Sequence, residues 1–454
     1  MKKKYQIVLD FIKQEIISKN LKPGSKLPSI LEVSKMLQYN KDTIIHAYNE
    51  LVKEHLAYSV PKSGYYLVSK SERENYISET DCIDFCPYIY SCKVIPDIEL
   101  QHCFNQSIDL YKEKMLTVSD VSGGIVSLRE TIQKQLQNLQ IFTKPENVFV
   151  TTGSQQSISI LVNNELPNRK TKILVEQPTC SEILNALKLC NAITIGIERN
   201  SDGINLDELE NIFKNENIKF FYTMPRFHNP TGYSFSSEQK RKILKLAQKY
   251  NVYIVEDDCF AEIDLDKKVD PMFSDDSSRV IYIKSYSKIL FPWLRLGIIV
   301  FPSQLSDLFK GVKICSNIIE QGALELYIKN GMYDKHIKQI KQIYRTRMNE
   351  LKKACCKYLN SKIKTQIPDT GCFTCIELPK NIHAHSLVSS LELRNIKIAT
   401  ADSSYLPLHK KTNCICLNIS NVDEKKIEKG IKIISEELDS SSDIGIKNLL
   451  KWND

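Results

Sequence analysis

The sequence lacks any long apolar run and any recognisable export signal. No apolar stretch approaches the ~18 residues needed to cross a bilayer. The segment Met1–Glu15 is basic at Lys2–Lys4, but Asp10 and Lys13 interrupt the apolar core that a signal peptide would need. We therefore expect a cytoplasmic protein with no membrane segment.

Cysteine spacings typical of metal sites are also scarce. The 14 cysteines are scattered along a chain with no export signal, which favours reduced thiols over disulfides. Cys372 and Cys375 form a single CxxC spacing, and no second pair stands at zinc-ligand distance. We expect most cysteines to be small core residues, and we expect no metal site.

Arginine is absent from the first 70 residues, which hold twelve lysines and six acidic residues. The net charge of the whole chain is only +8, and twelve lysines less six acidic residues leave this segment with +6 of it. An electrostatic partner is therefore expected at the N-terminal region.

The chain divides into three regions by pattern, as expected for a length that supports two or more domains. Residues 1–68 show short helical periods and end in a hairpin pattern that contains glycine. Residues 69–84 are polar without an apolar repeat, which indicates a linker. Residues 85–454 form the large domain, and from about 331–454 the pattern changes to long helices with a few strands.

Within the large domain, short apolar runs rich in valine and isoleucine alternate with amphipathic helical stretches. Such runs are typical of strands buried on both faces, and the alternation predicts an α/β fold with a mainly parallel sheet. The last region predicts a smaller α+β C-terminal subdomain. The predicted strands are Val148–Val150, Lys172–Val175, Phe220–Met224, Val252–Val255, Val280–Ile283 and Leu296–Phe301.

Polar groups follow several of these runs, at the sheet edge where α/β proteins bind ligands. They are Thr152-Gly153-Ser154-Gln155, Asn229-Pro230-Thr231-Gly232, Glu256-Asp257-Asp258 and Ser285-Tyr286-Ser287-Lys288. Together they offer a lysine, an acid, an amide and a phosphate cradle. Pyridoxal phosphate needs all four, because its aldehyde takes a lysine amine, its ring nitrogen takes an acid and its phosphate takes hydroxyls and N–H groups.

The order of these motifs, with Leu294-Arg295-Leu296-Gly297 after the lysine, resembles type I aminotransferases, and in particular the MocR/GabR regulators that carry a GntR-like DNA-binding domain. The resemblance implies that Lys288 forms the internal aldimine, that Asp257 pairs with the pyridine nitrogen and that Asn229 bonds the phenolic oxygen. It also implies a phosphate site made of Ser154, Gln155, Ser285, Ser287 and Arg295.

The sequence departs from this family pattern at four positions. Cys180 and Cys259 stand where the family has aromatic residues near the cofactor, and Ser119 replaces a tyrosine that reaches the partner subunit. Cys416 stands where an arginine clamps the substrate carboxylate, a loss worth on the order of 2–5 kcal/mol of binding. These changes argue against conventional transamination. The three cysteines either fill small pockets in a drifted domain or suit a changed ligand.

The N-terminal region predicts a winged helix-turn-helix. Leu21–Ser29 resembles the GntR turn, a helix from about Lys41 to Glu54 would enter the major groove, and Tyr58–Val68 reads as the wing. A small helical domain for protein contacts is the alternative. The candidate DNA contacts are Ser29, Lys41, Thr43, His46, Lys62 and Gly64.

These patterns together predict a transcription regulator in which a small-molecule effector changes the large domain of a head-to-tail homodimer and repositions two DNA-reading modules at an operator. Given Cys416, the effector could be the cofactor itself instead of an amino acid. Two alternatives remain: an aminotransferase with a vestigial DNA module, and a dimerisation scaffold that has lost cofactor binding.

Overall fold

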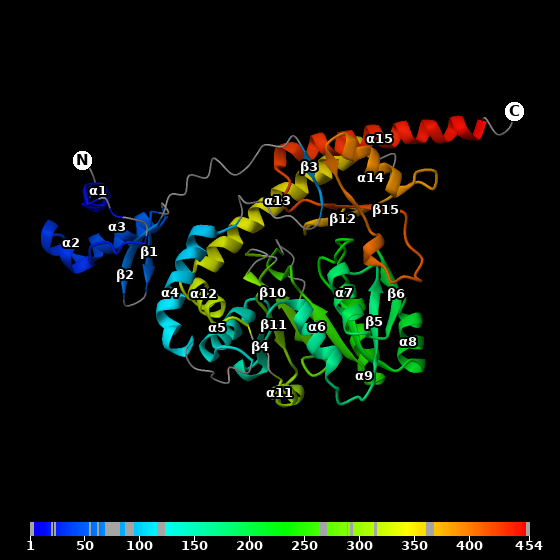
Figure 1. Ribbon diagram of the computed structural model, residues 1–454, viewed down its shortest axis with the longest axis horizontal. Coiled ribbons are helices and arrows are strands. Elements are labelled where there is room, and N and C mark those ends of the chain that lie inside the picture. The colour runs from blue at the N-terminus through cyan, green and yellow to red at the C-terminus, as the bar shows by residue number, and fades with distance from the viewer. Residues whose placement is uncertain are drawn as a thin grey trace. The chain divides into compact units, whose positions relative to one another are not determined.

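The computed structural model describes residues 4–19, 21, 24–53, 56–60, 63–68, 82–86, 95–115, 123–263, 270–287, 289–290, 294–312, 316–359 and 367–450. The chain forms two compact units (Figure 1). The first comprises residues 1–80, 96–116 and 322–335, and the second comprises residues 81–95, 117–321 and 336–454.

The N-terminal part of the first unit is three helices followed by a two-stranded hairpin. Its elements are α1 (Lys4–Ser18), α2 (Ile30–Leu37), α3 (Lys41–Lys53), β1 (Ala57–Val60) and β2 (Gly64–Leu67). One apolar cluster, which includes Val8, Val33, Ile44 and Tyr48, joins α1, α2 and α3 to the hairpin. The predicted helix and wing are therefore confirmed in position.

Two further helices contribute to the first unit: α4 (Asp97–Met115) and the C-terminal half of α12 (Ile318–Lys329). Tyr111 of α4 donates a hydrogen bond of 2.7 Å to the buried Glu325 of α12. The ring of His102, also on α4, contacts the ring of Tyr58 on β1. Helix α4 is thus packed against the hairpin within this unit.

The second unit is built on an eight-stranded sheet in the order β4-β11-β10-β9-β8-β5-β6-β7. Strands β10, β9, β8, β5 and β6 run parallel, whereas β11 is antiparallel to both β10 and β4. The expected mainly parallel sheet is confirmed. The strands are β4 (Val148–Thr151), β5 (Lys172–Gln177), β6 (Thr194–Asn200), β7 (Gly203–Ile204), β8 (Ile218–Thr223), β9 (Tyr253–Asp257), β10 (Val280–Ser285) and β11 (Gly297–Val300).

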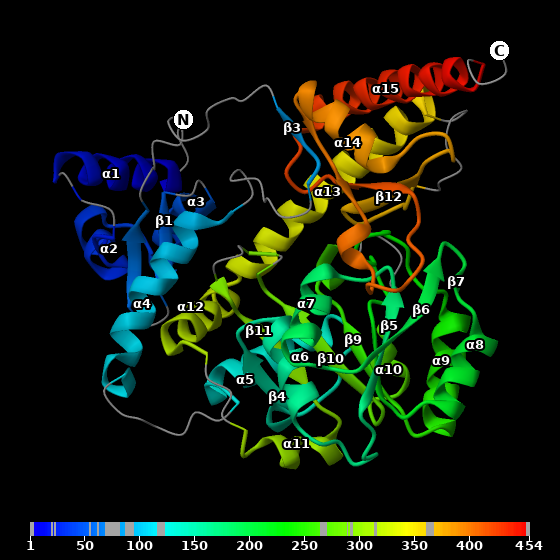
Figure 2. The same cartoon turned by 45° about the vertical axis from the view of Figure 1, so that its right-hand side comes forward.

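Helices cover the sheet, and the central strands β8, β9, β10 and β11 are buried along their whole length. Helix α6 contacts β4, β10 and β11, and Figure 2 shows α8 and α9 side by side. The helices are α5 (Val126–Gln137), α6 (Ser154–Asn163), α7 (Ser181–Leu189), α8 (Leu206–Asn215), α9 (Ser237–Lys249), α10 (Met272–Asp275) and α11 (Ser303–Phe309), with 3₁₀ turns at Pro145–Asn147 and Ala261–Ile263.

The C-terminal part contains a three-stranded sheet in the order β12-β15-β14, together with long helices. A short strand, β13, pairs in parallel with β3, which lies at the end of the region expected to be a linker; residues 69–81 of that region lie outside the described residues. The elements are β3 (Ile83–Asp84), α13 (Met332–Tyr358), β12 (Phe373–Glu377), α14 (Ala384–Leu393), β13 (Ile396–Lys397), β14 (Ala399–Thr400), the 3₁₀ turn Asp402–Ser404, β15 (Cys414–Asn418) and α15 (Glu424–Leu450).

Candidate functional site

The predicted phosphate residues meet where β4 ends and α6 begins. Gly153 has φ 109°, a backbone conformation suited to glycine, and α6 begins at Ser154 with no side-chain cap on its N–H groups. A Cβ at Gly153 would lie 3.5 Å from Nη2 of Arg295, so the guanidinium lies beside this helix end. Ser285 pairs with Gly297, and a Cβ added at Gly297 would lie 2.8 Å from Cα of Gly153. A helix N-terminus beside an arginine is a suitable anion site.

Two other predicted phosphate residues differ in exposure. Ser287 is buried, and its Oγ has no hydrogen-bond partner among the described residues. A buried hydroxyl without a partner is costly unless a ligand satisfies it, so this atom fits a phosphate oxygen. Gln155 lies in the first turn of α6 and is exposed.

The predicted ring-binding acid, Asp257, is the last residue of β9 and is buried. Tyr222 on the neighbouring strand β8 donates a hydrogen bond of 2.8 Å to its Oδ2. Burial raises the pKa of Tyr222 well above its usual value, so the phenol stays protonated and acts as a donor. The sequence interpretation missed this tyrosine, since nothing in a buried strand marks one residue as a neighbour of Asp257.

Asn229 lies beyond the C-terminal end of β8, and its Nδ2 is 3.7 Å from Sγ of Cys180. Burial and the charge of Asp257 are the main causes of the raised pKa of Tyr222, and the neighbouring Cys180 and Cys259 raise it further. The amide, the acid and two of the three substituted cysteines therefore gather at one edge of the sheet.

A buried cluster of charged residues stabilises the strand ends at this edge of the sheet. Glu176 on β5 contacts Arg199 and accepts hydrogen bonds from the Thr223 hydroxyl and from the N–H of Met224, at 3.1 Å for the latter. Burial alone would raise the pKa of Glu176, but the charge of Arg199 and hydrogen bonds from His228 and Thr223 lower it to about 2. The ionised cluster fixes the ends of β5 and β8, which lead to Cys180 and Asn229.

A small hollow of about 50 Å³ lies beside Asn229, with room for a few water molecules. Its lining contains Cys416 and no arginine among the residues that surround it in the described chain. This is the position at which the resemblance implies a carboxylate-binding arginine. The lining residues are Ser181, Glu182, Asn229, Pro230, Phe373, Ala399, Thr400, Ser403, Ser404, Cys416, Leu417 and Asn418.

Two residues of the predicted cofactor site, Lys288 and Ser119, lie outside the described residues. The positions on either side of Lys288 are described: Ser287 and Ile289 are both buried. The role of Lys288 stays a prediction.

In the first unit, four candidate DNA contacts lie on or before the second and third helices. Ser29 is the N-cap of α2, and its Oγ accepts a hydrogen bond of 3.2 Å from the N–H of Glu32. Lys41 and His46 are exposed on α3, and the imidazole of His46 lies 4.4 Å from the ring of Tyr5. Thr43 is half-buried near the N-terminus of α3, the end expected to enter the groove.

At the wing, Gly64 begins β2 with φ 120°, which favours glycine, while Lys62 lies outside the described residues. The backbone of the exposed Lys26 forms an isolated antiparallel β-bridge with Tyr66. A Cβ added at Gly64 would lie 3.3 Å from Cε of Lys26. The sequence interpretation missed Lys26, although it lies within the same GntR-like segment as Ser29.

Comparison with known proteins supports the interpretation of both parts of the chain. Residues 80–434 match the family described as aminotransferase class I and II, and residues 4–67 match the bacterial regulatory proteins of the gntR family. The chain is 37% identical over 444 residues to the uncharacterized HTH-type transcriptional regulator YcxD of Bacillus subtilis, covering 96% of this chain and 100% of that one. It is 25% identical over 382 residues to the HTH-type transcriptional regulator NorG of Staphylococcus aureus, covering 77% and 85%.

A solved structure shares the fold of the larger part. The kynurenine aminotransferase of Pyrococcus horikoshii has a TM-score of 0.71 and 25% sequence identity, and the alignment covers 80% of this chain and 92% of that one. Residues 80–434 therefore have the type I aminotransferase fold, a pyridoxal-phosphate fold.

The fold and the N-terminal module together define a DNA-binding regulator with an aminotransferase-like domain. This chain belongs to the aminotransferase class I and II family and, through the fused gntR module, to the HTH-type transcriptional regulators of the MocR/GabR type. Its cofactor is pyridoxal phosphate, its N-terminal module binds DNA, and its function is transcription regulation. No helix in the described part of the chain is long and apolar enough to span a membrane.

Proposed function

We propose that this regulator responds to the occupancy of its cofactor site, with pyridoxal phosphate itself as the effector. The observation that carries this proposal is the hollow beside Asn229, where Cys416 stands and no arginine is found among the described residues of the lining. A thiol cannot make the two parallel hydrogen bonds by which a guanidinium holds a carboxylate. An ordinary amino acid would therefore bind weakly, whereas the groups suited to the phosphate are retained.

In this proposal, each predicted residue has a defined task toward the cofactor. When bound, the cofactor supplies an aldehyde and an electron-withdrawing ring. The amine of Lys288 holds it covalently, the carboxylate of Asp257 bonds the ring nitrogen, and Asn229 bonds the phenolic oxygen. The phosphate is held by Ser154, Gln155, Ser285, Ser287 and Arg295.

We further infer a head-to-tail homodimer in the cytoplasm, in which two winged-helix modules bind paired half-sites of an operator. In each module Ser29, Lys41, Thr43, His46, Lys62 and Gly64 would contact DNA. Lysines contribute phosphate attraction, and Thr43 and His46 are placed to reach base edges. With no arginine in the first 70 residues, the best bidentate reader of guanine is missing, which favours sites rich in A·T pairs.

The direct test measures DNA affinity with and without pyridoxal phosphate. The duplex is one selected from random DNA by the full-length protein, and salt is held constant because phosphate contacts make affinity strongly salt-dependent. We expect at least a fivefold change in affinity on adding the cofactor, in the range of ordinary allosteric coupling. Pyridoxine, which lacks both aldehyde and phosphate, should have no effect. Identical affinities with and without the cofactor would reject the proposal.

Retained aminotransferase activity alongside DNA binding is the second candidate, favoured by the presence of Asp257, Asn229 and Arg295 together. A screen of amino donors with 2-oxo acids separates the two. Turnover at ordinary enzyme rates of ~1 s⁻¹ or more would favour the enzyme. Turnover far below that rate is what we expect, because Cys416 replaces the carboxylate clamp.

A further inference from the structure

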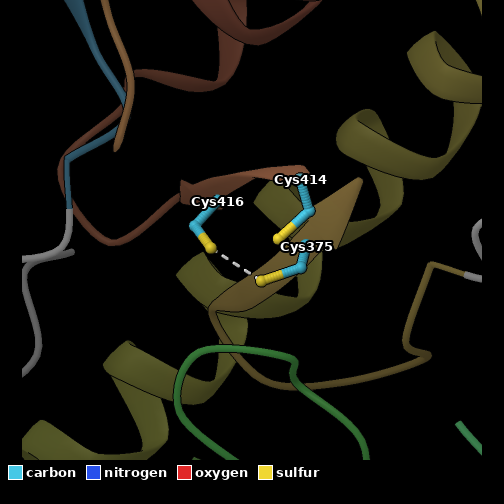
Figure 3. A group of neighbouring side chains, drawn as sticks. All are labelled: Cys375, Cys414 and Cys416. Atoms are coloured by element: carbon cyan, nitrogen blue, oxygen red, sulfur yellow. Dashed lines mark hydrogen bonds between the residues drawn. The ribbon is translucent and has the colours of Figure 1, made fainter. Parts of the chain in front are cut away.

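Three cysteines that are distant in the sequence meet in the C-terminal part of the second unit. Strands β12 and β15 are antiparallel, and Cys375 lies directly opposite Cys416. Cys414 precedes Cys416 by two residues on β15, so its side chain leaves the same face of the sheet. Figure 3 shows the three thiols turned toward one another. All three sulfur atoms lie within 4.8 Å of one another, and the Sγ atoms of Cys375 and Cys416 are 2.7 Å apart.

We propose that Cys375, Cys414 and Cys416 form a binding site for Zn²⁺. In a tetrahedral site with Zn–S bonds of about 2.3 Å, neighbouring sulfur atoms are about 3.8 Å apart. The Sγ atoms of Cys375 and Cys416 are closer than this, and no pair in the cluster is more than 4.8 Å apart, so these two thiols have to separate by about 1 Å to admit the ion. Thiolates are soft ligands and select zinc over magnesium or calcium.

The three thiols are buried together, which suits binding of a metal ion. The cysteines are only 8%, 4% and 7% exposed, and Ala401 and Tyr405 complete the cluster. Cys416 also lines the hollow beside Asn229, which gives the ion an entry path and leaves room for water as a fourth ligand. The ion would then occupy the place that the resemblance assigns to a carboxylate-binding arginine.

Two simpler roles explain less of this arrangement. Cysteines do fill apolar cores as small residues, but packing alone does not require three sulfur atoms from two strands to converge. A disulfide between Cys375 and Cys416 would use two of the three thiols and would leave Cys414 beside it without a role. The sequence interpretation expected no metal site because it weighed only the spacing of Cys372 and Cys375, whereas strand pairing supplies the actual neighbours.

Zinc binding has a defined proton balance. The ion takes up three thiolates, so as many as three thiol protons are released to solvent. The hydrogen bond of 3.4 Å that Cys375 donates to the carbonyl of Pro230 is lost in the process. Affinity should therefore fall as pH decreases.

The proposal is independent of the proposed function, because metal binding can be measured without DNA. Full-length protein, reduced and freed of metal, is titrated with Zn²⁺ against a chromophoric chelator. We expect one Zn²⁺ per chain, with Cys375→Ser, Cys414→Ser and Cys416→Ser each weakening binding at least tenfold. Cys355→Ser, which changes a buried cysteine of α13 outside the cluster, should bind Zn²⁺ as the unaltered protein does.

A second measurement guards against variants that simply misfold. Co²⁺ replaces Zn²⁺ in thiolate sites and gives a sulfur-to-metal absorption band whose intensity follows the number of thiolates bound. The band should decrease in each cluster variant while the circular dichroism spectrum is retained. No stoichiometric Zn²⁺ uptake, uptake unchanged in Cys416→Ser, or a Cys375–Cys416 disulfide that when reduced gives no metal binding would overturn the proposal.

Discussion

At the scale of single residues, a buried hydroxyl without a hydrogen-bond partner can either be part of the packing or bind a ligand, and substitution can distinguish the two roles. The hydroxyls of Ser287 and Thr374 are both buried with no hydrogen-bond partner among the described residues. Only Ser287 lies among the predicted phosphate residues, near the end of β10. The two hydroxyls therefore make a matched pair of positions for testing where the cofactor binds.

Removing the hydroxyl of Ser287 should lower the thermal stability of the protein only when the cofactor is present. In the cofactor-free protein Ser287→Ala removes a buried group without a partner, so the melting temperature should stay the same or rise slightly. With pyridoxal phosphate the variant loses a bond to the phosphate, so the stabilisation by the cofactor should decrease. Thermal unfolding with and without the cofactor measures both effects.

Thr374→Val is the control for this experiment, since it removes a comparable hydroxyl from β12. Its cofactor-induced shift in melting temperature should equal that of the unaltered protein. An undiminished shift in Ser287→Ala would remove Ser287 from the phosphate site.

At the scale of secondary structure elements, α2 illustrates how a local sequence sets a helix end. The Ser29 side chain accepts a hydrogen bond from the N–H of Glu32, and the Glu32 carboxylate accepts one of 2.7 Å from the N–H of Ser29. This reciprocal pair is a capping box. A residue proposed to contact DNA thus has a structural role as well, and a single substitution cannot separate the two.

Two substitutions at Ser29 together separate capping from DNA contact. Ser29→Ala should destabilise the N-terminal module by about 1 kcal/mol, because the cap is lost. Ser29→Asp keeps a capping oxygen and should retain stability, but its charge repels phosphate and should weaken DNA binding. Urea unfolding and DNA titration of both variants measure this. Full DNA affinity in Ser29→Asp would show that Ser29 acts only as a cap.

The packing of α4 on the hairpin predicts a pH dependence. Burial lowers the pKa of His102 to about 3, whereas an unfolded histidine titrates near 6.5. The unfolded chain therefore binds a proton that the folded chain excludes, so stability is complete above about pH 6.5 and decreases as pH falls toward 3. Melting temperature measured against pH should decrease less steeply in His102→Phe, which keeps a ring against Tyr58 without titrating.

The exposed histidine His385 provides the control for this pH series. His385→Gln should leave the pH dependence of the melting temperature close to that of the unaltered protein. Equal slopes in His102→Phe and the unaltered protein would contradict the role of His102.

The sequence predicted the central elements well, because their signals are local. The run Val280–Ile283 lies within β10, and the helix expected from about Lys41 to Glu54 is described as α3 from Lys41 to Lys53, with Glu54 outside the described residues. Strand β6 was missed, since it lies near the sheet edge and mixes charged residues with half-buried ones. The two-residue strand β3 is too short to leave any pattern.

At the scale of the whole molecule, the site depends on strand order, which no local pattern encodes. The sequence placed Ser154, Asn229, Asp257 and Ser285 at strand ends, but the order β4-β11-β10-β9-β8-β5 is what makes those ends neighbours. The resemblance to a known family implied that these residues share one cofactor site. It could not supply Tyr222 beside Asp257 or the meeting of three cysteines, because both depend on register between strands of this particular chain.

The account rests on pyridoxal phosphate held by the amine of Lys288, and one spectrum tests this most directly. The full-length protein is saturated with pyridoxal phosphate, passed through a desalting column and scanned in the visible range. We predict a yellow protein with about one cofactor per chain, a colourless Lys288→Ala variant, and full colour in Lys310→Ala, which changes an exposed lysine paired with Asp307. A colourless unaltered protein, or equal colour in Lys288→Ala, would contradict the account.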